Sequence, residues 1–246
     1  MSTDDPQRPQ PGLFATTRWS IVRSAGQTSS PESHAALSKL CETYWFPLYV
    51  YVQRRVNSTA EAQDLTQAFF VAFLEKNYAE TADPQRGRFR AFLLTAFKHF
   101  LSKEWAKAKT LKRGGDQRIL SLDFRAADSS LQIEPATGLT AEQHYDRQWA
   151  ITLLARVLDQ LAGEYQSRNQ MDLFERLKLF ITGDNPGTSY TDVAVQLQMN
   201  EPAIRKTVSR MRQRYRELLR IEISDTVTDS AEVEDEIRNL FATLQL

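Results

Sequence analysis

The spacing of apolar residues between positions 89 and 101 constrains the fold more than any other feature. Seven apolar residues fall there at i, i+3, i+4, i+7, i+8, i+11 and i+12, which places their side chains on one stripe of an α-helix. They are Phe89, Phe92, Leu93, Ala96, Phe97, Phe100 and Leu101. Similar spacing recurs at residues 37–48, 149–161 and 173–181, and no stretch shows the sustained period-two alternation of a half-buried strand. The sequence therefore predicts an all-α fold.

Capping residues and a proline predict where helices begin or break in the N-terminal half. Ser58 and Glu61 have the spacing of a capping box, which predicts a helix that runs to about Asn77. Pro47 lies inside an apolar helical pattern. It predicts a kink or an interruption there, because proline removes a backbone donor.

A polar segment divides the chain into two predicted helical domains. Residues 114–140 contain Gly-Gly, Pro, Ser and Thr with only scattered apolar residues, a composition typical of a flexible linker. We expect a disordered N-terminus at 1–13, helical domains at 14–113 and 141–222, and an acidic extension at 223–246.

Charge is segregated along a chain whose formal net charge is zero. Residues 86–113 hold nine Lys or Arg and one Glu, and residues 205–220 hold seven and one. Residues 222–246 reverse the balance, with seven Asp or Glu and one Arg. Such blocks on helical patterns indicate interaction surfaces, although a solvated helix face is the alternative.

The second basic block follows a short helix with clear boundaries. Ser189 and Asp192 have capping-box spacing, which predicts a helix that ends at about Leu197. Asn200 is a favourable N-cap for the next helix, and Pro202 is tolerated in its first turn. Two helices separated by three or four residues indicate a helix-turn-helix.

A helix-turn-helix places the N-terminal side chains of its second helix in the major groove of DNA. We expect Ala194 at the closest approach of the two helices, and an internal core of Val193, Leu197, Met199 and Ile204. Gln198 occupies the turn, where glycine in a left-handed conformation is common. Ile204, Val208, Met211 and Tyr215 would face inward on the second helix. The residues predicted to bind DNA are Glu201, Arg205, Lys206, Ser209, Arg210 and Arg212. The alternative is a basic helix that packs by its apolar stripe and binds nothing.

The sequence gives little indication of catalysis. His34, His99, His144 and Cys41 lie far apart, and no P-loop, GxSxG or HExxH pattern occurs. We therefore expect no enzyme activity, no cofactor and no metal. The single cysteine suits a reducing compartment, and the chain has no apolar run near 18 residues and no signal-peptide h-region. We expect a cytoplasmic protein that does not contact a membrane.

Three segments, taken in order, resemble the extracytoplasmic-function (ECF) sigma factors of bacterial RNA polymerase. EAQDLTQAFFVAFLEKNY resembles their second-region helix, the helix from Phe89 resembles their promoter-melting and minus-10 helix, and residues 189–220 resemble their fourth-region helix-turn-helix. FATTRWSIVRSAG and the acidic C-terminal helix also resemble the large ECF subgroup of planctomycete-type bacteria. Ala68, where the family usually has Glu, and Gln198 depart from the pattern.

The resemblance implies a subunit that directs core polymerase to promoters and initiates transcription by reading the minus-35 and minus-10 elements and melting the DNA. Asp64 and Gln67, one turn apart, would meet the clamp helices of the polymerase β′ subunit, and the β flap is a further implied partner. The family also implies regulation by an anti-sigma factor or a kinase-linked regulator. The residues implied in minus-10 binding and melting are Arg86, Arg88, Lys98, His99, Lys103, Trp105, Lys107 and Lys109.

Two other functions are compatible with the residues alone. The first is a helix-turn-helix transcriptional regulator that binds DNA but does not join RNA polymerase. The second is a helical adaptor whose basic faces bind RNA or an acidic protein.

The acidic extension carries a predicted short helix at residues 230–243. Its apolar residues to be buried are Val233, Ile237, Leu240 and Phe241. We expect it to fold back onto the C-terminal domain and to place carboxylates near the basic DNA-reading helix, where they would compete with promoter phosphates. The alternative is a solvated tail that improves solubility.

Overall fold

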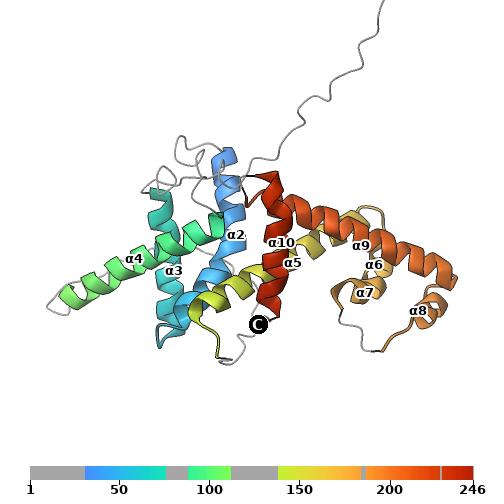
Figure 1. The fold of residues 1–246 in the computed structure, drawn as a ribbon, viewed down its shortest axis with the longest axis horizontal. Coiled ribbons are helices and arrows are strands. Elements are labelled where there is room, and N and C mark those ends of the chain that lie inside the picture. Colours follow the sequence, from blue (N-terminus) through green and yellow to red (C-terminus); the bar gives the residue numbers. More distant parts are fainter. Residues whose placement is uncertain (1–30, 76–87, 112–137, 184–186, 228, 246) are drawn as a thin grey trace, which may run out of the picture.

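The computed structural model describes residues 31–75, 88–111, 138–183, 187–227 and 229–245, with side chains from residue 41 onward except at 74–75 and 109–111. The N-terminal half holds α2 (Pro31–Gln53), α3 (Thr59–Glu75) and α4 (Phe89–Leu111). The C-terminal half holds α5 (Ala141–Gln166), α6 (Met171–Leu177), α7 (Leu179–Thr182), α8 (Tyr190–Gln196), α9 (Glu201–Ser224), the 3-10 turn η2 (Ser230–Glu232) and α10 (Val233–Leu244). The described residues contain no strand, which confirms the all-α prediction (Figure 1).

The apolar stripe at residues 89–101 forms the core of the N-terminal half. Six of its seven side chains are buried, and Phe92 packs half-buried beside them. The Phe69 ring of α3 lies against the stripe, with its centroid 4.8 Å from that of Phe97 and 5.7 Å from that of Phe100. Such aromatic pairs contribute about 0.5–1.5 kcal/mol each beyond their burial. This cluster holds α4 against α3 and so fixes which face of α4 meets solvent.

The interruption predicted at Pro47 does not occur. α2 continues as one helix from Pro31 to Gln53. A proline inside a helix costs about 3 kcal/mol, because a hydrogen bond is lost and the preceding turn is crowded. Tyr44, Leu48 and Tyr51 on either side are fully buried. Burial of one large apolar side chain contributes about 1.5–3 kcal/mol, so packing outweighs the cost of the proline.

α5 is the central helix and contacts both halves of the molecule. It packs against α2 of the N-terminal half and against α9 and α10 of the C-terminal half, and α10 lies between the two halves in Figure 1. Arg156 of α5 reaches Glu42 of α2 at 3.4 Å, while Glu164 pairs with Arg214 of α9 at 2.6 Å. α5 is therefore one of the elements through which the two halves meet.

The start of α5 is fixed by a capping box. The Thr140 hydroxyl accepts a hydrogen bond from the Gln143 N–H at 3.2 Å, and the Gln143 side chain accepts one from the Thr140 N–H at 2.7 Å. Most of the predicted linker at 114–140 lies outside the described residues, as do residues 1–13 and the FATTRWSIVRSAG stretch. The predicted domain boundaries therefore stay predictions.

The acidic extension folds back onto the C-terminal half, as expected. α10 contacts both α5 and α9, with Val233 and Leu240 buried and Ile237 packed against the core. Phe241, which we expected to be buried, is 45% exposed because it lines an open groove. None of the described helices is long and apolar enough to cross a membrane.

The single cysteine, Cys41, lies within the core on α2. Burial, with a smaller contribution from the neighbouring Glu42 carboxylate, raises the pKa of the thiol to about 12. The thiol is therefore protonated at neutral pH.

Candidate nucleic-acid interface

α8 and α9 begin at the predicted caps. The Ser189 hydroxyl accepts a hydrogen bond from the Asp192 N–H at 3.1 Å, and the Asp192 carboxylate accepts one from the Ser189 N–H at 3.0 Å. Hydrogen bonds from Ser189, first from its hydroxyl and then from its N–H, lower the pKa of Asp192. The Asn200 side chain accepts from the Ala203 N–H at 2.8 Å. Both capping predictions are confirmed.

The turn between α8 and α9 is left-handed at Gln198, whose φ is 52°. A residue with a Cβ in that conformation costs about 1 kcal/mol. Of the four residues predicted to form the internal core, Val193 and Ile204 are buried and Leu197 is half-buried. Met199 differs from the prediction, since it is 37% exposed. The chain reverses at Gln198, and this reversal turns the next side chain toward solvent. Ala194, which was predicted at the closest approach of the two helices, is also buried.

The N-terminal part of α9 presents predicted DNA-binding residues outward. The exposed members are Arg205, Lys206, Ser209, Arg210 and Arg212, and Glu201 is half-buried. Arg205 pairs with Glu201 at 2.6 Å, and its guanidinium lies 4.5 Å above the Tyr190 ring. The Thr191 hydroxyl of α8 donates to Glu201 at 2.8 Å. Arg205 and, next, Thr191 lower the pKa of Glu201. These contacts fix the first turn of α9 against α8 and position Arg205.

Arg212, which is also predicted to bind DNA, is exposed and forms hydrogen bonds with α7. Its Nε and Nη2 donate to the Phe180 carbonyl oxygen of α7 at 3.1 and 2.8 Å. Arg214, which the sequence did not single out, holds α9 against Glu164 of α5. Both arginines anchor α9, and this part of the helix is therefore supported by α5 and α7 together.

α3 presents the predicted polymerase-binding pair on its surface. Asp64 is exposed and Gln67 is half-buried, while Phe69 and Phe73 of the same helix are buried. The Ser58 hydroxyl accepts a hydrogen bond from the Glu61 N–H at 3.3 Å, so the predicted cap of this helix is confirmed. Asp64 thus lies on a capped, well-packed helix, which suits rigid presentation of a charge to a partner.

α4 carries the predicted minus-10 residues in several environments. Arg88 pairs with Glu236 of α10 at 2.8 Å, Lys98 pairs with Glu142 of α5 at 2.7 Å, and Lys107 pairs with Glu104 of its own helix at 2.6 Å. The remaining described side chains are the exposed His99 and Lys103 and the half-buried Trp105. Lys109 lies on α4 but its side chain is not described, and Arg86 lies outside the described residues.

A cavity of about 490 Å³ lies beside this face of α4. Lys98 and Trp105 line it together with Arg55 from the end of α2 and Glu142 from the start of α5. The Glu142 carboxylate contacts both cations, with Arg55 at 2.9 Å. A hydrogen bond from Lys98 is the main reason why the pKa of Glu142 is lowered. The sequence did not predict Arg55 or Glu142, since no local pattern links them to α4.

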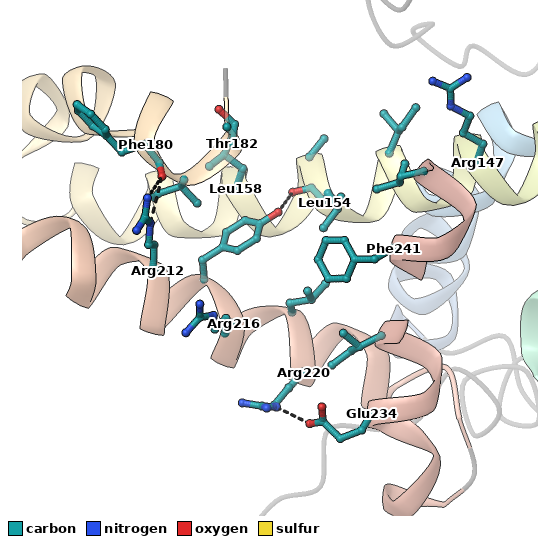
Figure 2. Close-up of a pocket in the computed structure, with 18 residues that line it drawn as sticks. Arg147, Leu154, Leu158, Phe180, Thr182, Arg212, Arg216, Arg220, Glu234 and Phe241 are labelled. Carbon is teal, nitrogen blue, oxygen red and sulfur yellow. Dashed lines mark hydrogen bonds and ion pairs between the residues drawn. The ribbon is translucent and has the colours of Figure 1, made fainter. Parts of the chain in front are cut away.

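A larger groove of about 1090 Å³ runs between α5, α7, α9 and α10 (Figure 2). Leu154, Leu158 and Phe241 contribute to its apolar lining, and the rim carries Arg216 and Arg220. Elsewhere in the described part of the chain, no three His, Cys, Asp or Glu side chains gather closely enough to hold a metal ion. An apolar groove with a basic rim suits an amphipathic helix with acidic edges.

Comparison with known proteins places part of this arrangement in a family. Residues 42–110, from α2 through nearly all of α4, match the family model of sigma-70 region 2. No curated protein and no solved structure matches the chain significantly. The matched segment contains the exposed pair on α3 and the basic face of α4. By this match, the N-terminal half is similar to region 2 of the sigma-70 factors, which supports a sigma-70 family factor with a role in promoter recognition by RNA polymerase.

Proposed function

We propose that this chain is an ECF-type sigma factor, a dissociable initiation subunit of bacterial RNA polymerase that acts in the cytoplasm. The helix-turn-helix of α8 and α9 reads the minus-35 element, and α4 binds and melts the minus-10 element. Asp64 and Gln67 of α3 dock on the β′ clamp helices, and the C-terminal half meets the β flap. An anti-sigma factor or a kinase-linked regulator would control its release.

One combination of observations supports this proposal above others. The region 2 match at residues 42–110 and the two capped helices α8 and α9 at residues 189–224 occur on the same chain, in the order that a sigma factor requires. A regulator that only binds DNA has no use for region 2. The basic faces of α4 and α9 supply the two nucleic-acid contacts that the proposal needs.

The direct test is transcription by purified core polymerase, with and without this protein, on promoters selected from the native genome. We expect initiation only when the protein is present. Absence of initiation on every selected promoter would defeat the proposal. Tight, salt-dependent binding to duplex DNA without initiation would instead identify a regulator that does not join polymerase.

Replacement of Arg205 or Arg210 by Ala should weaken binding to the upstream promoter element. Both side chains lie on the outward face of α9 near its N-terminus, where arginine pairs with guanine edges. A base-reading arginine contributes about 1–3 kcal/mol and fixes the preferred base, whereas a phosphate contact weakens all sequences alike. The measurement is affinity for duplexes that carry each base at each position.

Arg216→Ala is the matched control, because Arg216 is exposed on the same helix but lies about three turns beyond Arg205 and nearly two turns beyond Arg210. It should keep the base preference of the wild type. Unchanged affinity and unchanged salt dependence in both Arg205→Ala and Arg210→Ala would show that the recognition surface lies elsewhere.

A further inference from the structure

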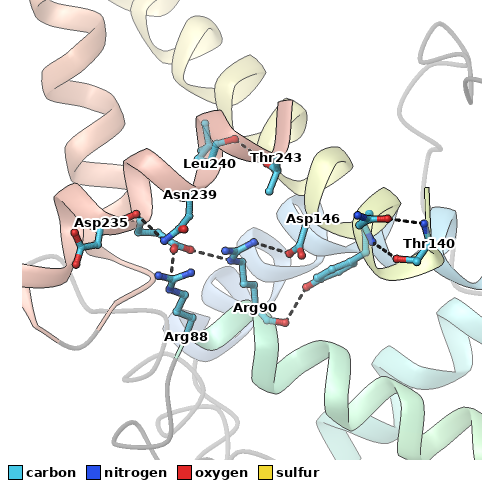
Figure 3. A network of polar contacts seen from close by, with 11 residues as sticks. Arg88, Arg90, Thr140, Asp146, Asp235, Asn239, Leu240 and Thr243 are labelled. Carbon is cyan, nitrogen blue, oxygen red and sulfur yellow. Dashed lines mark hydrogen bonds and ion pairs between the residues drawn. The ribbon is translucent and has the colours of Figure 1, made fainter. Parts of the chain in front are cut away.

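The buried carboxylate of Glu236 on α10 pairs with two arginines at the start of α4, Arg88 and Arg90, which Figure 3 labels. The Glu236 side chain is 0% exposed and pairs with Arg88 and Arg90 at 2.8 Å each. Arg90 also pairs with Asp146 of α5 at 2.5 Å, and its guanidinium lies 4.5 Å above the Trp149 ring. One residue of the acidic extension thus joins α10 to the N-terminal half.

Burial of this carboxylate argues against a merely solvated tail. A tail that only improves solubility keeps its charges in water, because removing a carboxylate from water is costly unless cations surround it. Burial raises the pKa of Glu236, and Arg90 and Arg88 offset part of that rise. The contact between Glu234 of α10 and Arg220 of α9 is exposed. Glu236 is therefore the specific contact of the extension.

The same junction includes contacts that do not depend on charge. The Tyr145 hydroxyl of α5 donates to the Arg90 carbonyl oxygen at 3.0 Å. The Phe89 N–H at the start of α4 donates to the carbonyl oxygen of Thr226, a buried residue between α9 and α10, at 3.5 Å. The start of α4 therefore packs against the chain segment that connects α9 to α10.

Carboxylates from the C-terminal half form ion pairs with two of the cations that are proposed to bind DNA at α4. Glu236 holds Arg88, and Glu142 holds Lys98. A carboxylate and a phosphate are both anions that pair with these groups by charge. DNA bound at these positions must displace them. We expected the carboxylates of the acidic extension to lie near the predicted minus-35 residues of α9. In the structure, Glu234 instead pairs with Arg220, near the C-terminal end of that helix.

We propose that α10 is an autoinhibitory strap, in which Glu236 holds the C-terminal half against α4 while Glu142 covers Lys98, so that the free protein masks its minus-10 face from single-stranded DNA. This inference rests on the proposed function of α4. Binding of core polymerase or of promoter DNA must break both contacts.

The test uses the full chain with Glu236→Gln, and the probe is a fluorescent 15-nucleotide single-stranded DNA of random sequence. The amide keeps the shape of the side chain but no longer holds Arg88 by charge. We expect binding about three- to fivefold tighter at 50 mM salt. The plot of log affinity against log salt should steepen by about 0.7, the value of one regained phosphate contact on single strands.

Glu234→Gln is the matched control, because it removes the same charge from the same helix but breaks only the exposed pair with Arg220. It should leave the affinity for the oligonucleotide unchanged. An equal gain in Glu234→Gln would mean that general repulsion from an acidic tail, rather than the strap, limits binding. That outcome would overturn the inference.

Glu142→Gln provides a second variant in case Glu236→Gln does not fold. The Glu142 side chain is 38% exposed, so the fold does not depend on its charge. It should also tighten binding and steepen the salt dependence by about 0.7 through release of Lys98. If each folded variant binds the oligonucleotide as the wild type does, the inference is wrong, and the contacts are only a structural brace.

Measurements with core polymerase distinguish an error in the autoinhibition inference from an error in the proposed function. Unchanged DNA binding by the variants, together with initiation by the wild type, would overturn the strap and leave the sigma-factor proposal intact. If neither wild type nor variants bind core polymerase or initiate transcription, the proposed function fails. The oligonucleotide measurement would still decide whether carboxylates mask α4.

Discussion

Asp64→Arg should abolish co-elution of the protein with core RNA polymerase while the variant folds as the wild type does. Asp64 is exposed on α3, and the neighbouring Phe69 and Phe73 hold that helix by its opposite face. An arginine there would therefore leave the core intact. It would reverse the charge that Asp64 is proposed to present to the β′ clamp helices, and like charges in an interface cost several kcal/mol. Gel filtration of the variant with core polymerase measures the loss.

Asp159→Arg is the control for the change in net charge. Asp159 is exposed on α5, outside the segment that matches region 2. This variant should co-elute with core polymerase as the wild type does, and both variants should bind the upstream element normally. Co-elution of Asp64→Arg at the wild-type level would show that this face of α3 is not the docking site.

Trp149→Ala should reduce the free energy of unfolding by about 3–5 kcal/mol, the usual cost of removing a fully buried aromatic side chain. Trp149 is 0% exposed on α5, and Arg90 lies over its ring. The variant loses apolar burial, leaves a cavity and removes the cation–π contact together. Because α5 contacts both halves, we expect a single cooperative unfolding transition to shift to lower urea. Far-ultraviolet circular dichroism during urea titration measures the shift.

Two controls separate these contributions. Trp149→Phe keeps a ring beneath Arg90, and it also removes an indole N–H that is buried without a hydrogen-bond partner, so its loss should be smaller. Trp105→Ala removes a half-buried tryptophan from α4 and should also cost less. A loss below about 1 kcal/mol for Trp149→Ala would contradict the central role of α5.

Features set by neighbours in sequence were predictable. The stripe at residues 89–101, the capping box of Ser189 with Asp192 and the N-cap at Asn200 each depend on spacings of a few residues. Helix periodicity and capping chemistry are local, and therefore the sequence displays them directly. The exposed face of α9 followed from the same periodicity.

Features set by distant packing were not predictable from one sequence. The pairs of Glu236 with Arg88 and Arg90 join residues from opposite halves of the chain, and no local spacing indicates them. The interruption predicted at Pro47 does not occur because the side chains around it are buried by tertiary packing, which the local sequence does not show. The hydrogen bonds of Arg212 were not predictable either, because periodicity gives the direction of a side chain but not a carbonyl oxygen on α7 within its reach.

The buried Cys41 gives the molecule an internal reporter of its own unfolding. Burial raises the thiol pKa to about 12 and keeps the thiol protonated in the folded protein, whereas an unfolded chain exposes a thiol with the ordinary pKa of about 8.5. Alkylation of the native protein must therefore proceed through molecules in which α2 has opened. The rate of alkylation therefore measures how often α2 opens. Because Cys41 is the only cysteine in the sequence, no other cysteine has to be replaced for this measurement.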